Sequence, residues 1–122
     1  MEGSLTVITI LPADKVFLQS FAAPDGVEAM VLRDSDDSVF GYALFRMAGK
    51  RVEILSVQTD LPVMAEGLIR SVLNTGDCRG AIEGFCAAER LAPMLRHLEF
   101  EPIEGGYVVS LEQFFRGECH CQ

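Results

Sequence analysis

The sequence predicts a single α/β domain built on a mixed, mostly antiparallel sheet flanked by helices. Three segments of β type, joined by short turns, lie between residues 27 and 59, which is typical of an antiparallel meander. A strand, a helix and a further strand then follow one another between residues 51 and 87, the order of a parallel βαβ unit. We expect the element order β-α-β-β-β-α-β-α-β over residues 1–116, and a flexible tail over residues 117–122.

The composition is that of an acidic globular protein. The chain has 122 residues, 49% of them hydrophobic, and a net charge of -8. This excess of acid disfavours binding to nucleic acid, which needs a basic surface. No apolar run approaches the ~20 residues that span a bilayer. The N-terminal segment has no basic region before its apolar stretch, so we expect no signal peptide and a cytoplasmic protein.

The first elements are a strand, a helix and a second strand. Residues 5–10 are rich in β-branched side chains and alternate as a strand does. Pro12 and Asp14 favour a helix start after this strand. The turn residues at 24–26 end that helix, and alternation over residues 27–33 predicts the second strand.

Two further strands complete the predicted meander. The segment 34–38, Asp-Ser-Asp-Asp-Ser, predicts a hairpin turn because Asp and Ser side chains bond to nearby backbone groups. A calcium loop is the alternative, but it needs more widely spaced oxygen ligands and a bidentate glutamate, so we favour the turn. Residues 39–47 and 51–59 predict the next strands, joined by a tight turn at 48–50.

A helix should follow over residues 60–76. Asp60 and Pro62 favour its start, and the Asn-Thr-Gly at 74–76 favours its end. Apolar side chains recur along it at helical spacing, at Met64, Leu68, Ile69 and Val72.

The remaining elements are a strand, a helix and a last strand. Residues 80–87 are apolar and predict the fifth strand. The helix after it should become regular near Ala92, because Pro93 is tolerated only in a first turn. A Gly-Gly pair leads into the last strand, residues 107–111.

The cysteines suggest one structural thiol and one unusual cluster. Cys86 lies inside an apolar strand and is expected to be a small buried hydrophobe. Cys119, His120 and Cys121 are all ligands that zinc accepts. Their spacing differs from that of common zinc sites, and no second ligand pair is evident. We therefore favour a tail that oxidises in vitro and predict no metal site.

Two stretches of sequence add to the information in the element order: residues 41–57, GYALFRMAGKRVEILSV, and residues 95–111, LRHLEFEPIEGGYVVSL. Together with the element order, they resemble the GNAT acyl-CoA N-acetyltransferase superfamily. The first stretch resembles its third and fourth strands, and the second resembles its closing helix and strand. The resemblance covers about residues 40–111 and, more weakly, residues 1–39, where one helix stands in place of the family's usual two.

This resemblance implies a binding site for acetyl-CoA. In the family, the fourth strand diverges from the fifth, and its exposed backbone pairs with the pantetheine arm. The residues implied to do so here are Val57, Gln58 and Thr59. The following loop and helix hold the pyrophosphate with backbone amides, which here would belong to Val63, Met64, Ala65 and Glu66.

The chain departs from the family at this loop. The family's Gln/Arg-x-x-Gly-x-Gly/Ala motif is replaced by residues 60–65, Asp-Leu-Pro-Val-Met-Ala, in which the basic residue and the first glycine are missing. Pro62 has no N–H, and Asp60 places a negative charge beside the phosphate position. Asp60 is equally suited to cap a structural helix, so a capped helix without phosphate is the alternative interpretation.

The implied catalytic residues are also incomplete. Glu53 matches a glutamate that serves as general base in some members, and a polar residue on the open face of a strand is its structural alternative. The family's proton-donating tyrosine falls at Leu95, which cannot donate a proton. His97 should point away from that position because helical geometry turns it by about 200°. Tyr42 and Tyr107 remain distant candidates.

Two functional hypotheses follow. The first is an acetyl-CoA-dependent N-acyltransferase that acts on an unknown amine, with Glu53 as base. The second is a non-catalytic GNAT-like module that binds a different ligand or a partner strand in the same opening. A homodimer fits both hypotheses.

Overall fold

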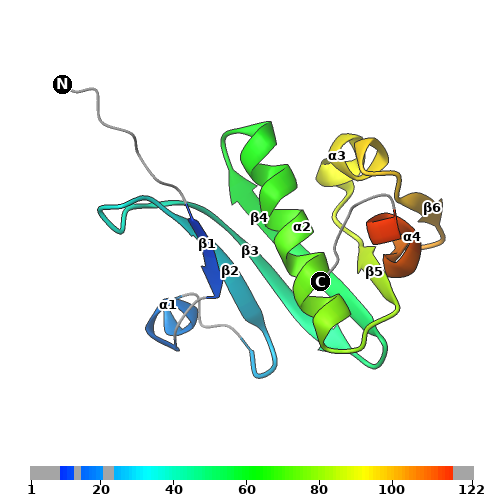
Figure 1. The fold of residues 1–122 in the computed structure, drawn as a ribbon, viewed down its shortest axis with the longest axis horizontal. Helices are drawn as coiled ribbons and strands as arrows, with labels where there is room; N and C mark the ends of the chain where they lie inside the picture. Colours follow the sequence, from blue (N-terminus) through cyan, green and yellow to red (C-terminus); the bar gives the residue numbers. More distant parts are fainter. Residues whose placement is uncertain (1–8, 13–14, 21–23, 117–122) are drawn as a thin grey trace.

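The computed structural model describes residues 9–12, 15–20 and 24–116, and it contains one seven-stranded sheet with strand order β1-β2-β3-β4-β5-β7-β6 (Figure 1). The strands are β1 (Thr9–Pro12), β2 (Glu28–Arg33), β3 (Val39–Ala48), β4 (Arg51–Thr59), β5 (Glu83–Cys86), β6 (Glu101–Ile103) and β7 (Gly106–Ser110). The helical segments are α1 (Lys15–Gln19), α2 (Pro62–Cys78), the 3₁₀ segment η1 (Glu89–Leu91), α3 (Ala92–His97) and α4 (Leu111–Arg116).

The pairing confirms a mixed, mostly antiparallel sheet. Every neighbouring pair of strands is antiparallel except β4 and β5, which are parallel. Helix α2 makes the crossover between those two strands, as the βαβ pattern predicts. The sheet therefore consists of an N-terminal meander and a C-terminal group of three strands, and the two are joined at a single parallel pair.

The core lies between the sheet and α2. Figure 1 shows α2 crossing the face of β3 and β4, and four of its side chains are completely buried there: Leu68, Ile69, Val72 and Leu73. Burying one such side chain stabilises the fold by about 1.5–3 kcal/mol. They pack with buried side chains of the sheet that include Phe45, Val52 and Ile54.

Strand β4 contains a β-bulge at Leu55. Leu44 of β3 pairs with Ser56 and Phe45 pairs with Ile54, so Leu55 is an extra residue on β4. The bulge lets both Ile54 and Val57 face the core, although three positions separate them. A bulge bends its strand and increases its twist.

The first strand ends differently from the sequence prediction. Pro12 was expected to begin a helix, but it is the last residue of β1, where it pairs with Met30. Because β1 is the edge of the sheet, a residue without an N–H is tolerated there. Residues 5–8 of the predicted strand lie outside the described residues. The predicted helix is the short α1.

The predicted turn at 34–38 is confirmed. The Asp34 carboxylate accepts hydrogen bonds from the amides of Asp36 and Ser38, at 2.8 and 2.9 Å. This is the local side-chain bonding that makes Asp a turn residue.

Helix α2 continues to Cys78, so the predicted end at residues 74–76 is wrong. Gly76 is a buried helical residue that lies against Val52 of β4. A Cβ atom at Gly76 would be 2.6 Å from Val52 Cγ1 and 2.7 Å from Val52 Cβ. The glycine is therefore explained by the close approach of helix and sheet, and not by a helix end.

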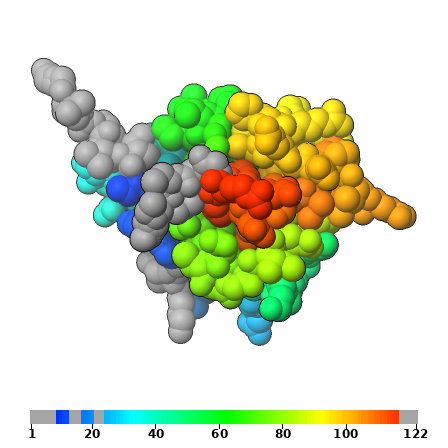
Figure 2. Space-filling view, turned by 45° about the vertical axis from the view of Figure 1, so that its right-hand side comes forward, coloured from blue at the N-terminus to red at the C-terminus, as the bar shows by residue number. Residues whose placement is uncertain are grey.

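Two short elements were not expected from the sequence. Strand β6 pairs with β7 across a turn, but all its residues are exposed and leave no pattern of alternating burial. Helix α4 follows β7 directly and brings Phe114 and Phe115 against the core, and Figure 2 shows it on the surface beside α2. The guanidinium of Arg70 on α2 stacks over the Phe114 ring at 5.1 Å. The predicted tail at 117–122 lies outside the described residues.

Helix α3 begins at Ala92 with Pro93 in its first turn, as predicted. It ends with Glu99 at a positive φ of 68°, while the Phe100 amide donates to the Leu95 carbonyl at 2.9 Å. This pattern is a Schellman-type end, in which glycine is usual at the position of Glu99. None of the helices in the described part of the chain is long and apolar enough to cross a bilayer.

The contact between Gly76 and Val52 makes a stability prediction. Gly76→Ala is expected to lower the free energy of unfolding by about 1–3 kcal/mol through overpacking, although alanine is favoured over glycine by about 1 kcal/mol in a free helix. Urea denaturation measures the change. Gly67→Ala in the same helix is the control, since its Cβ would meet only the Ile10 Cδ1 atom, at 3.3 Å. Equal effects of the two substitutions would show that close packing at Gly76 is not the cause.

Candidate functional site

An opening between β4 and β5 is the main candidate site. The two strands pair only from Arg51 with Glu83 to Ile54 with Cys86. Residues 55–59 of β4 continue past the end of β5, and no strand among the described residues pairs with them on that side. The opening begins where the Leu55 bulge bends β4, so the bulge and the divergence of the strands coincide.

The backbone implied to bind pantetheine lies along this opening. On its other side, β4 stays paired with β3, through Val57 with Ala43, Gln58 with Tyr42 and Thr59 with Gly41. Toward η1, the carbonyl oxygen of Val57 accepts a hydrogen bond from the Arg90 guanidinium. This edge of β4 is therefore extended backbone of the kind that a pantetheine chain would pair with. The Arg90 side chain already occupies one of its acceptors, the Val57 carbonyl oxygen.

The start of α2 offers fewer amides than the sequence implied. The amides of Met64 and Ala65 both donate to the Leu61 carbonyl, at 3.0 Å. Pro62 has no N–H, so the amide of Val63 is the remaining donor of this turn. Val63 is 70% exposed. A phosphate group could reach this amide, but the turn is a weaker anion site than a helix start with several amides pointing outward.

The predicted cap at Asp60 is wrong. Leu61 occupies the N-cap position, and no side chain caps the helix. Asp60 lies one residue before that position, too early to reach the amides of the first turn.

Glu66 connects α2 to α3. Its carboxylate accepts a hydrogen bond from Arg70 Nε at 3.0 Å and lies 3.4 Å from His97 Nε2. The predicted outward direction of His97 agrees with this placement on the helix surface. The Glu66 side chain is thus already bonded to Arg70 and close to His97, and a role in phosphate binding would come from its backbone.

Glu53 lies in a groove at the apex of the opening. Its neighbours Val52 and Ile54 face α2, so its own side chain projects from the opposite face of the sheet. Arg46 Nε holds the Glu53 carboxylate at 2.7 Å. The groove has a volume of about 360 Å³ and is lined by Arg46, Glu53, Ile54, Leu55, Phe85, Ala87 and Ala88.

The candidate proton donors are poorly placed. Leu95 is completely buried, so the family's tyrosine position is filled by core packing. Tyr107 is 4% exposed, and its hydroxyl donates to Glu89 Oε2 at 3.3 Å. The Tyr42 ring packs edge-on against Phe17, with the ring centroids 5.9 Å apart. No tyrosine side chain lines the groove that contains Glu53.

Cys86 is a buried thiol, as predicted. Burial raises its pKa, while a hydrogen bond with the Ala88 backbone and the positive charge of Arg90 oppose this shift. A thiol with a raised pKa is a poor nucleophile at neutral pH. Among the described residues, no group of three or more His, Cys, Asp or Glu side chains could hold a metal ion. Cys119, His120 and Cys121 lie outside those residues.

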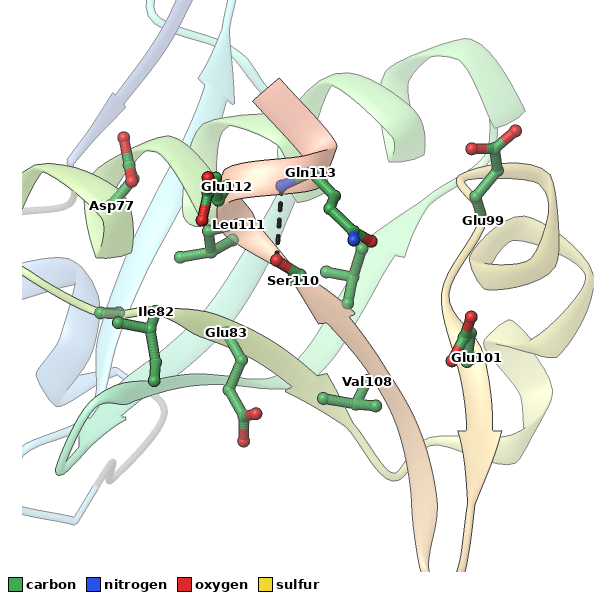
Figure 3. A pocket seen from close by; sticks show the side chains of 12 residues that line it. Asp77, Ile82, Glu83, Glu99, Glu101, Val108, Ser110, Leu111, Glu112 and Gln113 are labelled. Carbon is green, nitrogen blue, oxygen red and sulfur yellow. Dashed lines mark hydrogen bonds between the residues drawn. The ribbon is translucent and has the colours of Figure 1, made fainter. Parts of the chain in front are cut away.

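A larger acidic cavity, of about 720 Å³, lies at the opposite end of β5 (Figure 3). Glu83, the first residue of β5, lines this cavity, whereas the opening between β4 and β5 lies beyond Cys86, the last residue of β5. Its carboxylates are Asp77, Glu83, Glu99, Glu101 and Glu112. The sequence carries no signal for this cavity because these residues come from separate elements of the chain.

Comparison with known proteins establishes the fold. An acetyltransferase of the GNAT family from Staphylococcus aureus Mu50 aligns with a TM-score of 0.64 at 8% identity, over 86% of this chain and 99% of that one. The Escherichia coli protein YhhK, solved with coenzyme A bound, aligns with a TM-score of 0.61 at 15% identity, over 85% and 98% of the two chains. This chain has the GNAT fold.

The ribosomal-protein-S18-alanine N-acetyltransferase of Escherichia coli is also similar, with a TM-score of 0.59 at 10% identity over 85% of this chain and 89% of that one. No family model matches the sequence, and the search of curated proteins finds no match. The similarity is therefore one of fold, and the activity of this chain must be argued from its own residues.

The buried thiol makes a reactivity prediction. Cys78 is exposed and Cys86 is buried, and neither is in a disulfide. At a pH near the ordinary thiol pKa of about 8.5, iodoacetamide is expected to modify Cys78 in the native protein and Cys86 only after unfolding in urea. Peptide mass spectrometry distinguishes the two sites. Rapid modification of native Cys86 would contradict its assignment as a structural thiol.

Proposed function

We propose that this protein is an acetyl-CoA-dependent N-acyltransferase that acts on an amine. The observation that supports this most is the bulged edge of β4, which from Leu55 to Thr59 is not paired with β5 and leads directly to the start of α2. An extended pantetheine chain fits such an edge as an additional strand would. That YhhK, a protein of the same fold, was solved with coenzyme A bound supports the same ligand here.

The chain's own residues provide positioning and a base. Acetyl-CoA supplies an acyl group activated as a thioester. The amine binds in the groove at the apex, where the Glu53 carboxylate accepts the proton that the amine loses, directly or through one water molecule. Holding amine and thioester together provides much of the rate enhancement. With leucine at position 95 and no tyrosine in the groove, the departing thiolate takes its proton from solvent.

A non-catalytic binding module is the second candidate, and specific contacts favour it. The Glu53 carboxylate is already bound by Arg46 at 2.7 Å, and the first turn of α2 has lost most of its anion-binding amides. In this alternative, the same opening binds a different extended ligand, or a strand of a partner or of a second copy of the chain.

Cofactor binding is tested by thermal unfolding with acetyl-CoA. A ligand that binds only the folded protein at about 100 times its Kd adds about 2.7 kcal/mol of stability, which raises Tm by roughly 10 °C in a domain of this size. We expect a shift of this order at millimolar acetyl-CoA. If Tm does not move, the acyltransferase proposal fails and the binding module remains.

The role of Glu53 is tested by Glu53→Gln. Loss of a general base is expected to lower kcat by about 100-fold or more near neutral pH, with little change in acetyl-CoA affinity. Glu83→Gln is a matched control, because Glu83 forms the same kind of ion pair on the next strand, with Arg51 Nε at 2.7 Å. Acetylation is measured by thiol release from acetyl-CoA with a panel of amines. Equal turnover in the two variants would remove Glu53 from the mechanism.

A further inference from the structure

Arg90 reaches across the opening from the side of β5 to β4. It lies on η1, which follows the end of β5, and its guanidinium donates to the carbonyl oxygen of Val57. The two residues are 33 positions apart in the sequence. This side chain therefore connects the diverging strands at a point where no backbone pairing connects them.

The contact has a clear physical cause. Val57 is 2% exposed, so its backbone has little access to water. A buried carbonyl without a donor costs free energy. Strand β5 ends at Cys86, opposite Ile54, and cannot supply that donor. Arg90 supplies it in the ligand-free chain.

The positive charge of Arg90 is also available to pair with a ligand. Several arginines are neutralised by carboxylates, as Arg46 is by Glu53 and Arg79 is by Glu28, whereas Arg90 belongs with the arginines that are not. Within the described ranges, no carboxylate forms a salt bridge with Arg90. In a chain with a net charge of -8, an unneutralised cation beside the opening favours an anionic ligand.

We propose that Arg90 is a clasp that selects the ligand of this opening. In the free protein it occupies the Val57 acceptor. A ligand that pairs with β4 must displace it with an N–H donor of its own, and the released guanidinium then pairs with an anionic group of the same ligand. The site thus selects an extended amide chain that carries a phosphate or similar anion. This inference rests on the proposed acyl-CoA function and names the residue that discriminates coenzyme A from its uncharged fragment.

The test compares two probes on two variants. Pantetheine has the amide chain without phosphates, and coenzyme A has both. Isothermal titration measures Kd for each probe with the wild type, Arg90→Ala and Arg96→Ala. Arg96 is a matched control because it is an exposed arginine on α3 whose guanidinium lies 6.0 Å from the Tyr107 ring centroid, whereas the donor to Val57 is Arg90. Arg90 is itself exposed, so Arg90→Ala should fold, and its Tm verifies this.

We expect Arg90→Ala to bind pantetheine about tenfold more tightly, because one hydrogen bond to a charged donor no longer has to be broken. The affinity of Arg90→Ala for coenzyme A should stay at the wild-type value, because losing the contact between the guanidinium and the anion offsets the gain from the freed Val57 carbonyl. The preference for coenzyme A over pantetheine should therefore fall about tenfold, and its dependence on salt should weaken. Arg96→Ala should keep the wild-type preference.

Other outcomes separate this inference from the proposed function. If the wild type and Arg90→Ala bind both probes with the same preference, the clasp is wrong and the cofactor assignment stands. If Arg90→Ala binds pantetheine and the wild type binds neither pantetheine nor coenzyme A, an anionic ligand does not release Arg90, so both the selection by Arg90 and the acyl-CoA function are overturned. If neither protein binds either probe, both proposals are overturned.

Discussion

The short parallel pairing of β4 with β5 is the constraint on which the rest of the structure depends. It joins the antiparallel meander to the C-terminal strands through the register from Arg51 with Glu83 to Ile54 with Cys86. Two glycines let the helix above this junction approach it closely, Gly76 against Val52 and Gly84 against Leu73. Because the pairing ends early, the second half of β4 keeps one unpaired edge, and every functional proposal made for this chain uses that edge.

The same edge is common to both functions proposed for the chain, the enzyme and the binding module. The backbone that would bind pantetheine needs only an extended strand, which the sheet maintains for structural reasons. Anion binding at α2 and proton donation at Leu95 need particular residue types, and those residues are absent. Pairing with an extended backbone does not depend on those side chains, so the opening is compatible with either function.

Much of the fold could be predicted from local patterns, whereas contacts between distant segments could not. Alternation, turn residues and helical spacing were sufficient for β2 to β5, α2 and the start of α3. Pro12 and Gly76 misled the prediction because each has two uses, a helix boundary or a position set by tertiary packing, and only the position of β1 at the edge and the closeness of Val52 distinguish them. For the candidate site, the resemblance to the GNAT superfamily pointed to the β4 backbone, whereas the Arg90 contact joins segments that no local pattern connects.

The bulge at Leu55 has a consequence for the side chains of β4. On both sides of Leu55 the side chains of β4 keep the alternation of a regular strand, with Val52 and Ile54 before it and Val57 after it facing the core. In terms of the chain, β4 is an ordinary strand with a single residue inserted. The insertion leaves the buried side chains on either side of it facing the same core, and it lies where the pairing of β4 with β5 ends. Removing Leu55 would therefore leave every buried side chain of β4 facing the core, because the extra residue lies between them and carries none of the buried contacts.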